Sequence, residues 1–215
     1  MGLVFANAKL DRVHVAGALL LLAGIIFFLG MNIAMSTYPN FSVSGNWVAD
    51  LGATGEQPAS TFYAATKLSV GVLAIASSYL LWPVAKPRRP ILFLGIAGIA
   101  IFGSIQNIYM VQDLSSLVAF LFGALAAIDS YRIVRRPLGY FFVALGAIAL
   151  IAIFIIVSVN AGIAAPSLWM SLGKGGWEWM VLYSDFLWVI VFGTTLMTSR
   201  ELFAKNQPEP DRPRA

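Results

Sequence analysis

The chain has 215 residues, of which 59% are hydrophobic and 11% are charged, and its mean hydropathy is +0.81. Soluble domains carry about 25% charged residues, so this composition excludes an ordinary soluble domain and intrinsic disorder. The chain has no cysteine, which excludes disulfides, thiol nucleophiles and thiolate metal sites. The only histidine is His14, which excludes sites built from several histidines. We therefore expect a polytopic membrane protein without a metal or cofactor.

Six apolar segments are each long enough to cross a bilayer, which takes about 20 residues. The expected spans are Val15–Met35, Thr61–Val84, Ile91–Met110, Leu114–Val134, Leu138–Gly162 and Glu178–Ser199. Because these segments do not alternate apolar and polar residues, they favour helices over a β-barrel. The sequence predicts an all-α membrane protein with six transmembrane helices in one bundle, over residues 1–205. A polar, proline-rich cytoplasmic tail, residues 206–215, follows it.

The distribution of basic residues predicts the orientation in the cell membrane. Twelve of the 14 Lys and Arg residues fall on one side, in the N-terminal segment, after the second span, at the end of the fourth span and in the tail. Loops rich in Lys and Arg stay in the cytoplasm, so both termini are expected there. These residues are divided among four segments without a stacking platform, which predicts contact with the lipid bilayer and no nucleic acid partner.

Ionisable and amide side chains gather in the outer half of the expected spans. A charge inside a span is costly, so each one needs a partner or a function. Lys67 lies about six residues into the second span, and Asp185 lies about seven residues into the sixth. The residues expected to line an outward-facing polar pocket are Asp50, Lys67, Gln106, Asn107, Asp113, Glu178 and Asp185.

Three interpretations of Lys67 remain open at this point. Lys67 and Asp185 form an internal ion pair that fixes the helix register, Lys67 belongs to a pocket that binds something polar, or Lys67 extends to the surface. The matched depths predict that the outer ends of the second and sixth spans are neighbours. Lys67 would then lie within salt-bridge distance of Asp185 or Glu178. Asp129 is expected to pair with Arg132, one helical turn away.

The long outer loop before the second span contains side chains suited to local hydrogen bonds. Asn46 and Asp50 are expected to accept bonds from nearby backbone amides, and Gly52 to permit a turn. This turn would fold the loop over the helix ends as a lid, with Leu51 pointing inward. A glycine-rich run at 173–176 is expected to be flexible. The tryptophans expected to anchor the spans at the membrane surface are Trp47, Trp82, Trp169, Trp177 and Trp179, and only Trp188 is deep.

Two segments resemble a known family. Asn46–Gly52, NWVADLG, followed by Phe62, resembles the N-x-x-S-D-L-G…F-N signature of the DUF998 family. Gly176–Trp188 is similar to its G-x-E-R-x-x-x-Y-P-x-x-L-W pattern. The chain departs from these patterns at Tyr63, Trp179 and Ser184, where the family has Asn, Arg and Pro. The resemblance implies a six-helix membrane fold and implies no particular activity.

Two functions fit these observations. The first is binding of a lipid head group or small polar ligand in the outer pocket, and the alternative is a non-catalytic accessory subunit within a larger membrane complex. Small-residue helix faces favour the accessory subunit. A lipid-modifying enzyme that uses Asp50 and Glu178 as acid and base is weaker, because that side has no histidine and no metal-ligand set. A transporter is disfavoured because the sequence shows neither inverted repeats nor broken helices.

Overall fold

The computed structural model describes residues 2–53, 56–105, 109–134, 136–163, 167 and 169–198. Within these ranges every regular element is a helix. The elements are α1 (Gly2–Thr37), α2 (Asp50–Ala53), α3 (Ala59–Leu81), α4 (Arg89–Gly103), α5 (Tyr109–Asp129), the 3₁₀ turn η1 (Ser130–Arg132), α6 (Leu138–Asn160) and α7 (Trp169–Thr198).

Five of these helices contain apolar stretches long enough to cross a membrane. The stretches are 11–37, 59–81, 111–132, 138–160 and 171–198. They confirm an all-α protein of the multi-pass membrane class. The helix in the predicted third span, α4, has 15 residues and ends at Gly103, before the predicted Met110. At 1.5 Å per residue it is roughly 22 Å long, shorter than the ~30 Å hydrocarbon core. The third of the six expected spans therefore stays a prediction.

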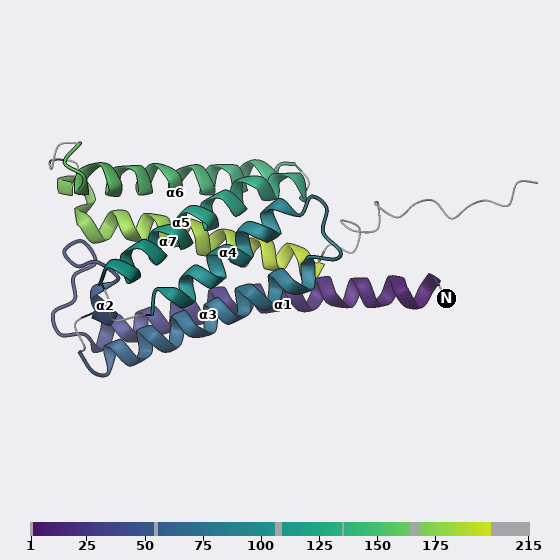
Figure 1. Cartoon of the computed structure of the whole chain (residues 1–215), viewed down its shortest axis with the longest axis horizontal. Coiled ribbons are helices and arrows are strands. Elements are labelled where there is room, and N and C mark those ends of the chain that lie inside the picture. Colours follow the sequence, from purple (N-terminus) through teal and green to yellow (C-terminus); the bar gives the residue numbers. More distant parts are fainter. Residues whose placement is uncertain are drawn as a thin grey trace, which may run out of the picture.

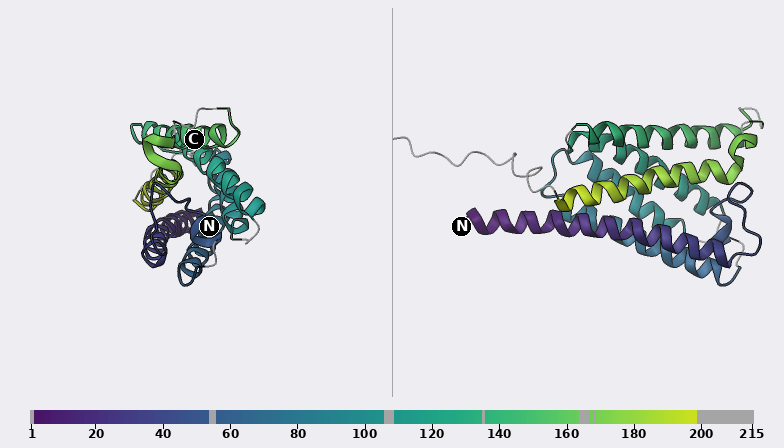
Figure 2. Two further views of the ribbon diagram at one scale, coloured as in Figure 1. Left: turned by 90° about the vertical axis from the view of Figure 1, so that its left-hand side faces the viewer. Right: turned by 180° about the vertical axis from the view of Figure 1, so that it is seen from behind.

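Consecutive long helices pack side by side and the chain closes into a ring (Figures 1 and 2). α3 packs on α4, α4 on α5, and α5 on α6 and α7, while α1 contacts both α3 and α7. α6 lies outside this ring, against α5 and α7. The first and last helices are thus neighbours, although they are far apart in the sequence.

The two ends of the molecule differ in charge. The start of α1, the end of α7 and the connections 82–88 and 130–137 lie at one end, which we call the basic end (Figure 1). The described basic residues in these connections are Lys86, Arg88, Arg132 and Arg136. The connection from α1 to α3 and the start of α7 form the opposite end, which we call the loop end. This arrangement matches the grouping on which the orientation prediction depends.

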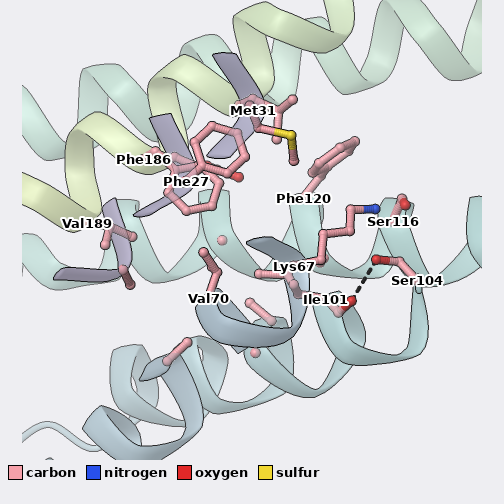
Figure 3. A pocket seen from close by; sticks show the side chains of 18 of the residues that line it. Phe27, Met31, Lys67, Val70, Ile101, Ser104, Ser116, Phe120, Phe186 and Val189 are labelled. Carbon is pink, nitrogen blue, oxygen red and sulfur yellow. Dashed lines mark hydrogen bonds between the residues drawn. The ribbon is translucent and has the colours of Figure 1, made fainter. Parts of the chain in front are cut away.

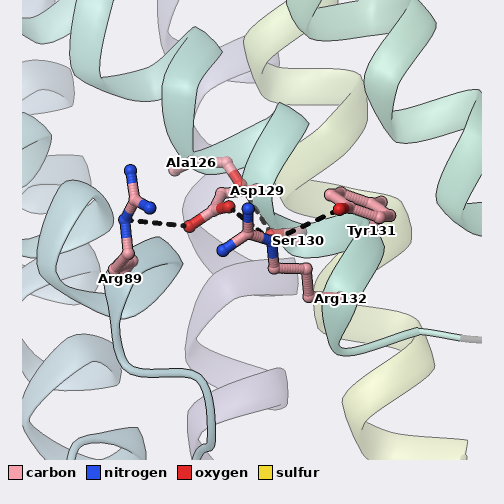
Figure 4. A network of polar contacts seen from close by, with 6 residues as sticks. All are labelled: Arg89, Ala126, Asp129, Ser130, Tyr131 and Arg132. Carbon is pink, nitrogen blue, oxygen red and sulfur yellow. Dashed lines mark hydrogen bonds and ion pairs between the residues drawn. The ribbon is translucent and has the colours of Figure 1, made fainter.

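Asp129 holds the basic end together (Figure 4). Its Oδ1 lies 3.1 Å from Arg132 Nε, and its Oδ2 lies 3.7 Å from Arg89 Nε. The predicted contact with Arg132 is confirmed. The contact with Arg89 joins α5 to α4, which no spacing along a single helix could reveal. Arg136 instead lies over the ring of Tyr140, at 5.5 Å from its centroid.

Glycines let neighbouring helices approach closely. A Cβ atom added at Gly17 would lie 2.6 Å from the backbone oxygen of Gly193, so α1 and α7 are in backbone contact there. Gly71 and Gly98 bring α3 and α4 together in the same way, with a Cβ on either one about 3 Å from the other's oxygen. Such small-residue contacts are typical of helix packing in membranes.

The outer faces of the helices carry large apolar side chains. Leu29, Ile99 and Phe154 are among the most exposed of them. In a soluble protein so much exposed apolar surface would mark an interface, whereas hydrocarbon solvates it without cost. Trp188 is buried as predicted, but Trp179 is also buried, between Phe27 and Tyr183, so its predicted role as a surface anchor is wrong.

Candidate functional site

Residues 38–53, which we call the cap segment, fold over the loop end. Asp50 Oδ2 accepts a hydrogen bond of 2.9 Å from the Trp47 amide, and Asn46 Oδ1 accepts one of 3.0 Å from the Ser42 amide. The predicted local roles of Asn46 and Asp50 are confirmed. Leu51 is completely buried, which confirms that it points inward. These contacts give the cap segment a fixed shape despite its short elements.

The predicted turn at Asp50–Gly52 is the single helical turn α2, and Gly52 also allows a close contact there. It lies within α2, in helical backbone, and a Cβ atom at this position would collide with the ring of Tyr63. The absence of a side chain therefore lets α2 lie directly on the start of α3. Tyr63 is itself buried beneath it.

The cap segment is bound to α7 by backbone contacts. The Val48 amide donates a 2.6 Å hydrogen bond to Glu178 Oε2, and the Gly175 amide donates one of 3.3 Å to the Ser44 oxygen. A Cβ at Gly173 or Gly175 would collide with backbone oxygens of the cap segment. The predicted flexibility of this glycine run is wrong, because its glycines allow a close packed contact.

α7 begins earlier than the sequence predicts, and this changes the depth of its charges. The helix starts at Trp169 and is broken at Gly173, where φ is 73°. Asp185 lies twelve residues beyond this break, or roughly 18 Å along the helix, and Glu178 only about 8 Å. Lys67 lies eight residues into α3, or roughly 12 Å. Both carboxylates therefore lie further along their helix than a start at Glu178 implied.

A cavity lies between α1, α3, α4, α5 and α7 (Figure 3). Its volume is about 70 Å³, measured as the space open to the centre of a water-sized sphere. On that measure one water needs about 10–15 Å³, so the cavity has room for several waters or a narrow apolar group. Most lining side chains are apolar or aromatic. The polar ones are Tyr63, Lys67, Ser104, Ser116, Glu178 and Asp185.

This lining corrects the expected polar pocket. Lys67, Glu178 and Asp185 line the cavity as predicted, but they do so in a mainly apolar wall. Asp113 lies exposed near the start of α5, and Asp50 uses its carboxylate within the cap segment. Neither residue lines the cavity. The other two candidates, Gln106 and Asn107, fall outside the described residues.

The Lys67 ammonium group lies over the ring of Tyr63, at 4.5 Å from its centroid. Figure 3 shows it pointing towards Ser116. The charges of Glu178 and Asp113 act on it. However, no carboxylate among the described residues lies within 4.0 Å of the Lys67 ammonium group, so the predicted salt bridge from Lys67 is wrong. α3 and α7 do not pack directly on each other, because α1 contacts both. Lys67 of α3 and Glu178 of α7 nevertheless line the same cavity, so the predicted proximity of the outer ends of these two helices holds without an ion pair.

Asp185 is the most isolated charge of the three. Its residue is 7% exposed, and its Oδ1 has no hydrogen-bond partner among the described residues. The carboxylate is seated against α5 at Gly123, where an added Cβ would lie 2.6 Å from Oδ2. The position of Asp185 along its own helix could not reveal this contact, because Gly123 belongs to a different helix.

The sequence interpretation also missed polar residues on α4 and α5. Gln112 is buried, and its Nε2 donates a 3.3 Å hydrogen bond to the Ala49 oxygen, which ties α5 to the cap segment. Ser116, one turn further, and Ser104 line the cavity. The available signal was the spacing of Gln112 and Ser116, four residues apart on one helix face.

Comparisons with family models, with curated proteins and with solved structures found no match. The resemblance to the DUF998 family therefore stays a prediction. The two segments that carry it, 46–52 and 176–188, meet in the structure through the bond from the Val48 amide to Glu178.

Proposed function

We propose that this membrane protein binds an amphipathic molecule in the cavity between α1, α3, α4, α5 and α7. The observation that carries the proposal is a cavity with apolar walls whose lining includes three ionisable residues, Lys67, Glu178 and Asp185. Ligand sites are typically concave and mostly apolar, with a few polar groups that fix orientation. Ionisable groups inside membrane spans are costly, and they commonly mark functional sites.

The walls favour an amphipathic molecule over a small polar ligand. Phe27, Met31, Phe120 and Phe186 contribute apolar surface from three different helices (Figure 3). A small polar ligand would lose its hydration against these side chains without recovering enough hydrogen bonds. A molecule with an apolar body and one polar group satisfies both parts of the lining.

The cap segment supports the proposal from the loop end. Val48 is buried and lines the cavity, and its amide is held by Glu178. The Glu178 carboxylate, which borders the cavity, thus also holds the cap segment that covers it.

We propose the membrane orientation that the distribution of basic residues predicts, with six spans and both termini in the cytoplasm.

Native purification followed by mass spectrometry tests the binding function. Ala119 is a small residue of α5 that lines the cavity, and Ala119→Leu would fill part of it. Ala65→Leu adds the same side chain on an exposed position of α3 and serves as the control. We expect the wild type and Ala65→Leu to retain a small amphipathic molecule that Ala119→Leu loses.

Retention of the same molecule by a folded Ala119→Leu variant would contradict binding in this cavity. Co-purification of protein chains in fixed ratio, without a small molecule, would favour the alternative role as an accessory subunit.

A further inference from the structure

The charges that line the cavity do not balance. The described lining contains one cation, Lys67, and two carboxylates, Glu178 and Asp185. The charge of Lys67 acts on Glu178, whose Oε2 also accepts the 2.6 Å bond from the Val48 amide. Glu178 is therefore compensated twice, and Asp185 remains.

Nothing in the described chain compensates Asp185. The residue is more than nine-tenths buried, Oδ1 has no hydrogen-bond partner, and Asp185 is absent from the ion pairs that the described residues form. Removing a carboxylate from water without a partner costs several kcal/mol. Ionisable residues inside membrane spans commonly mark binding sites or ion pathways, and a bound group of opposite charge would offset this cost.

The surroundings of Asp185 suit an organic cation. Phe186 follows it in the chain and stacks on Phe27, with 3.5 Å between ring centroids, and both rings line the same cavity as Phe120. Aromatic faces attract cations through their quadrupoles, most strongly away from water. A bare metal ion is disfavoured, because the described residues contain no group of three acidic or histidine side chains that could hold one.

Gly123 keeps this carboxylate in place. A methyl group at Gly123 would meet all three atoms of the Asp185 carboxyl group, at 2.6–3.4 Å. Because Gly123 has no side chain, the Asp185 carboxyl group packs directly on the backbone of α5 where Asp185 lines the cavity.

Resting on the proposed binding function, we infer that the ligand is an amphipathic organic cation, an amine whose ammonium group binds Asp185 while its apolar body lies along the aromatic wall.

Three probes with the same eight-carbon chain test this inference: n-octylammonium, 1-octanol and octanoate. The protein is placed in nanodiscs, and binding is followed by the methyl NMR signal of Met31, which lines the cavity. The signal is assigned with Met31→Leu. We expect n-octylammonium to bind at least tenfold more tightly than either of the other probes.

The variants separate a binding role of Asp185 from a structural one. Asp185→Asn and Gly123→Ala should each remove the preference for the ammonium probe. Gly103→Ala, at another close contact between α4 and α5, should keep it. Without any probe, Asp185→Asn should not lower the melting temperature, since it removes an unpaired buried charge. An unchanged preference in Asp185→Asn would overturn the inference, and so would a lower melting temperature, which would mark Asp185 as a structural residue.

The remaining outcomes are also decisive. Preferred binding of octanoate that is lost in Lys67→Met would overturn the cation assignment and leave the binding function standing. No response of Met31 to any of the three probes would count against both.

Discussion

Replacing Glu178 should loosen the cap segment to a degree that depends on the substitute. Glu178 is buried, and its Oε2 accepts the 2.6 Å bond from the Val48 amide. Glu178→Leu removes this acceptor and leaves a buried amide unpaired, which costs about 1–3 kcal/mol. Glu178→Gln keeps an acceptor oxygen and removes only the charge.

The difference between the two variants isolates the hydrogen bond. Because about 1.4 kcal/mol corresponds to a factor of ten, 1–3 kcal/mol predicts that the Val48 amide exchanges roughly 5–150 times faster in Glu178→Leu. In Glu178→Gln the rate should stay close to that of the wild type. The side chain of Leu is similar in size to that of Glu, so packing changes little between the variants.

Hydrogen exchange in detergent micelles, read by NMR at Val48, is the assay. Glu56→Gln changes an exposed carboxylate just beyond the cap segment and is the control. Equal exchange rates at Val48 in Glu178→Leu and the wild type would refute the reasoning. They would mean that the cap segment is held by its apolar contacts alone.

Two further predictions concern the basic end and the orientation. Asp129→Asn should lower the free energy of unfolding by about 1 kcal/mol, because its partners Arg89 and Arg132 are largely exposed. The loss should shrink in 1 M salt, and a loss that is independent of salt would count against an electrostatic origin. In this cysteine-free chain, Val43→Cys should react with an impermeant maleimide on intact cells, and Lys86→Cys only after the membrane is opened. The reverse pattern would reject the proposed orientation.

Features that depend on neighbours along the chain were predictable from the sequence. The pairing of Asp129 with Arg132 follows from a separation of three residues on a helix. The local bonds of Asn46 and Asp50 follow from the short reach of their side chains. The apolar stretches predicted most of the long helices, because a membrane span satisfies its backbone hydrogen bonds within its own segment.

The site itself depends on contacts between helices, which spacing does not encode. The sequence placed Asp185 at the level of Lys67 because α7 was taken to begin near Glu178. The helix instead starts at Trp169 and continues beyond a break at Gly173. The depth of Asp185 along α7 was therefore underestimated, and no ion pair joins it to Lys67 among the described residues. The seat at Gly123 depends on how α5 and α7 face each other, which only the folded chain defines.

The contact between α1 and α7 at Gly17 and Gly193 has a consequence for biogenesis. Chains are made from the N-terminus, and their N-terminal parts generally fold first. α1 can pair with α3 early, but its second neighbour, α7, is made only after α3, α4, α5 and α6. Until α7 is inserted, the cavity is an open groove facing lipid, and Lys67 lacks the two carboxylates that α7 contributes. Closure of the ring therefore waits for α7, and a chain truncated before residue 169 would never form the site.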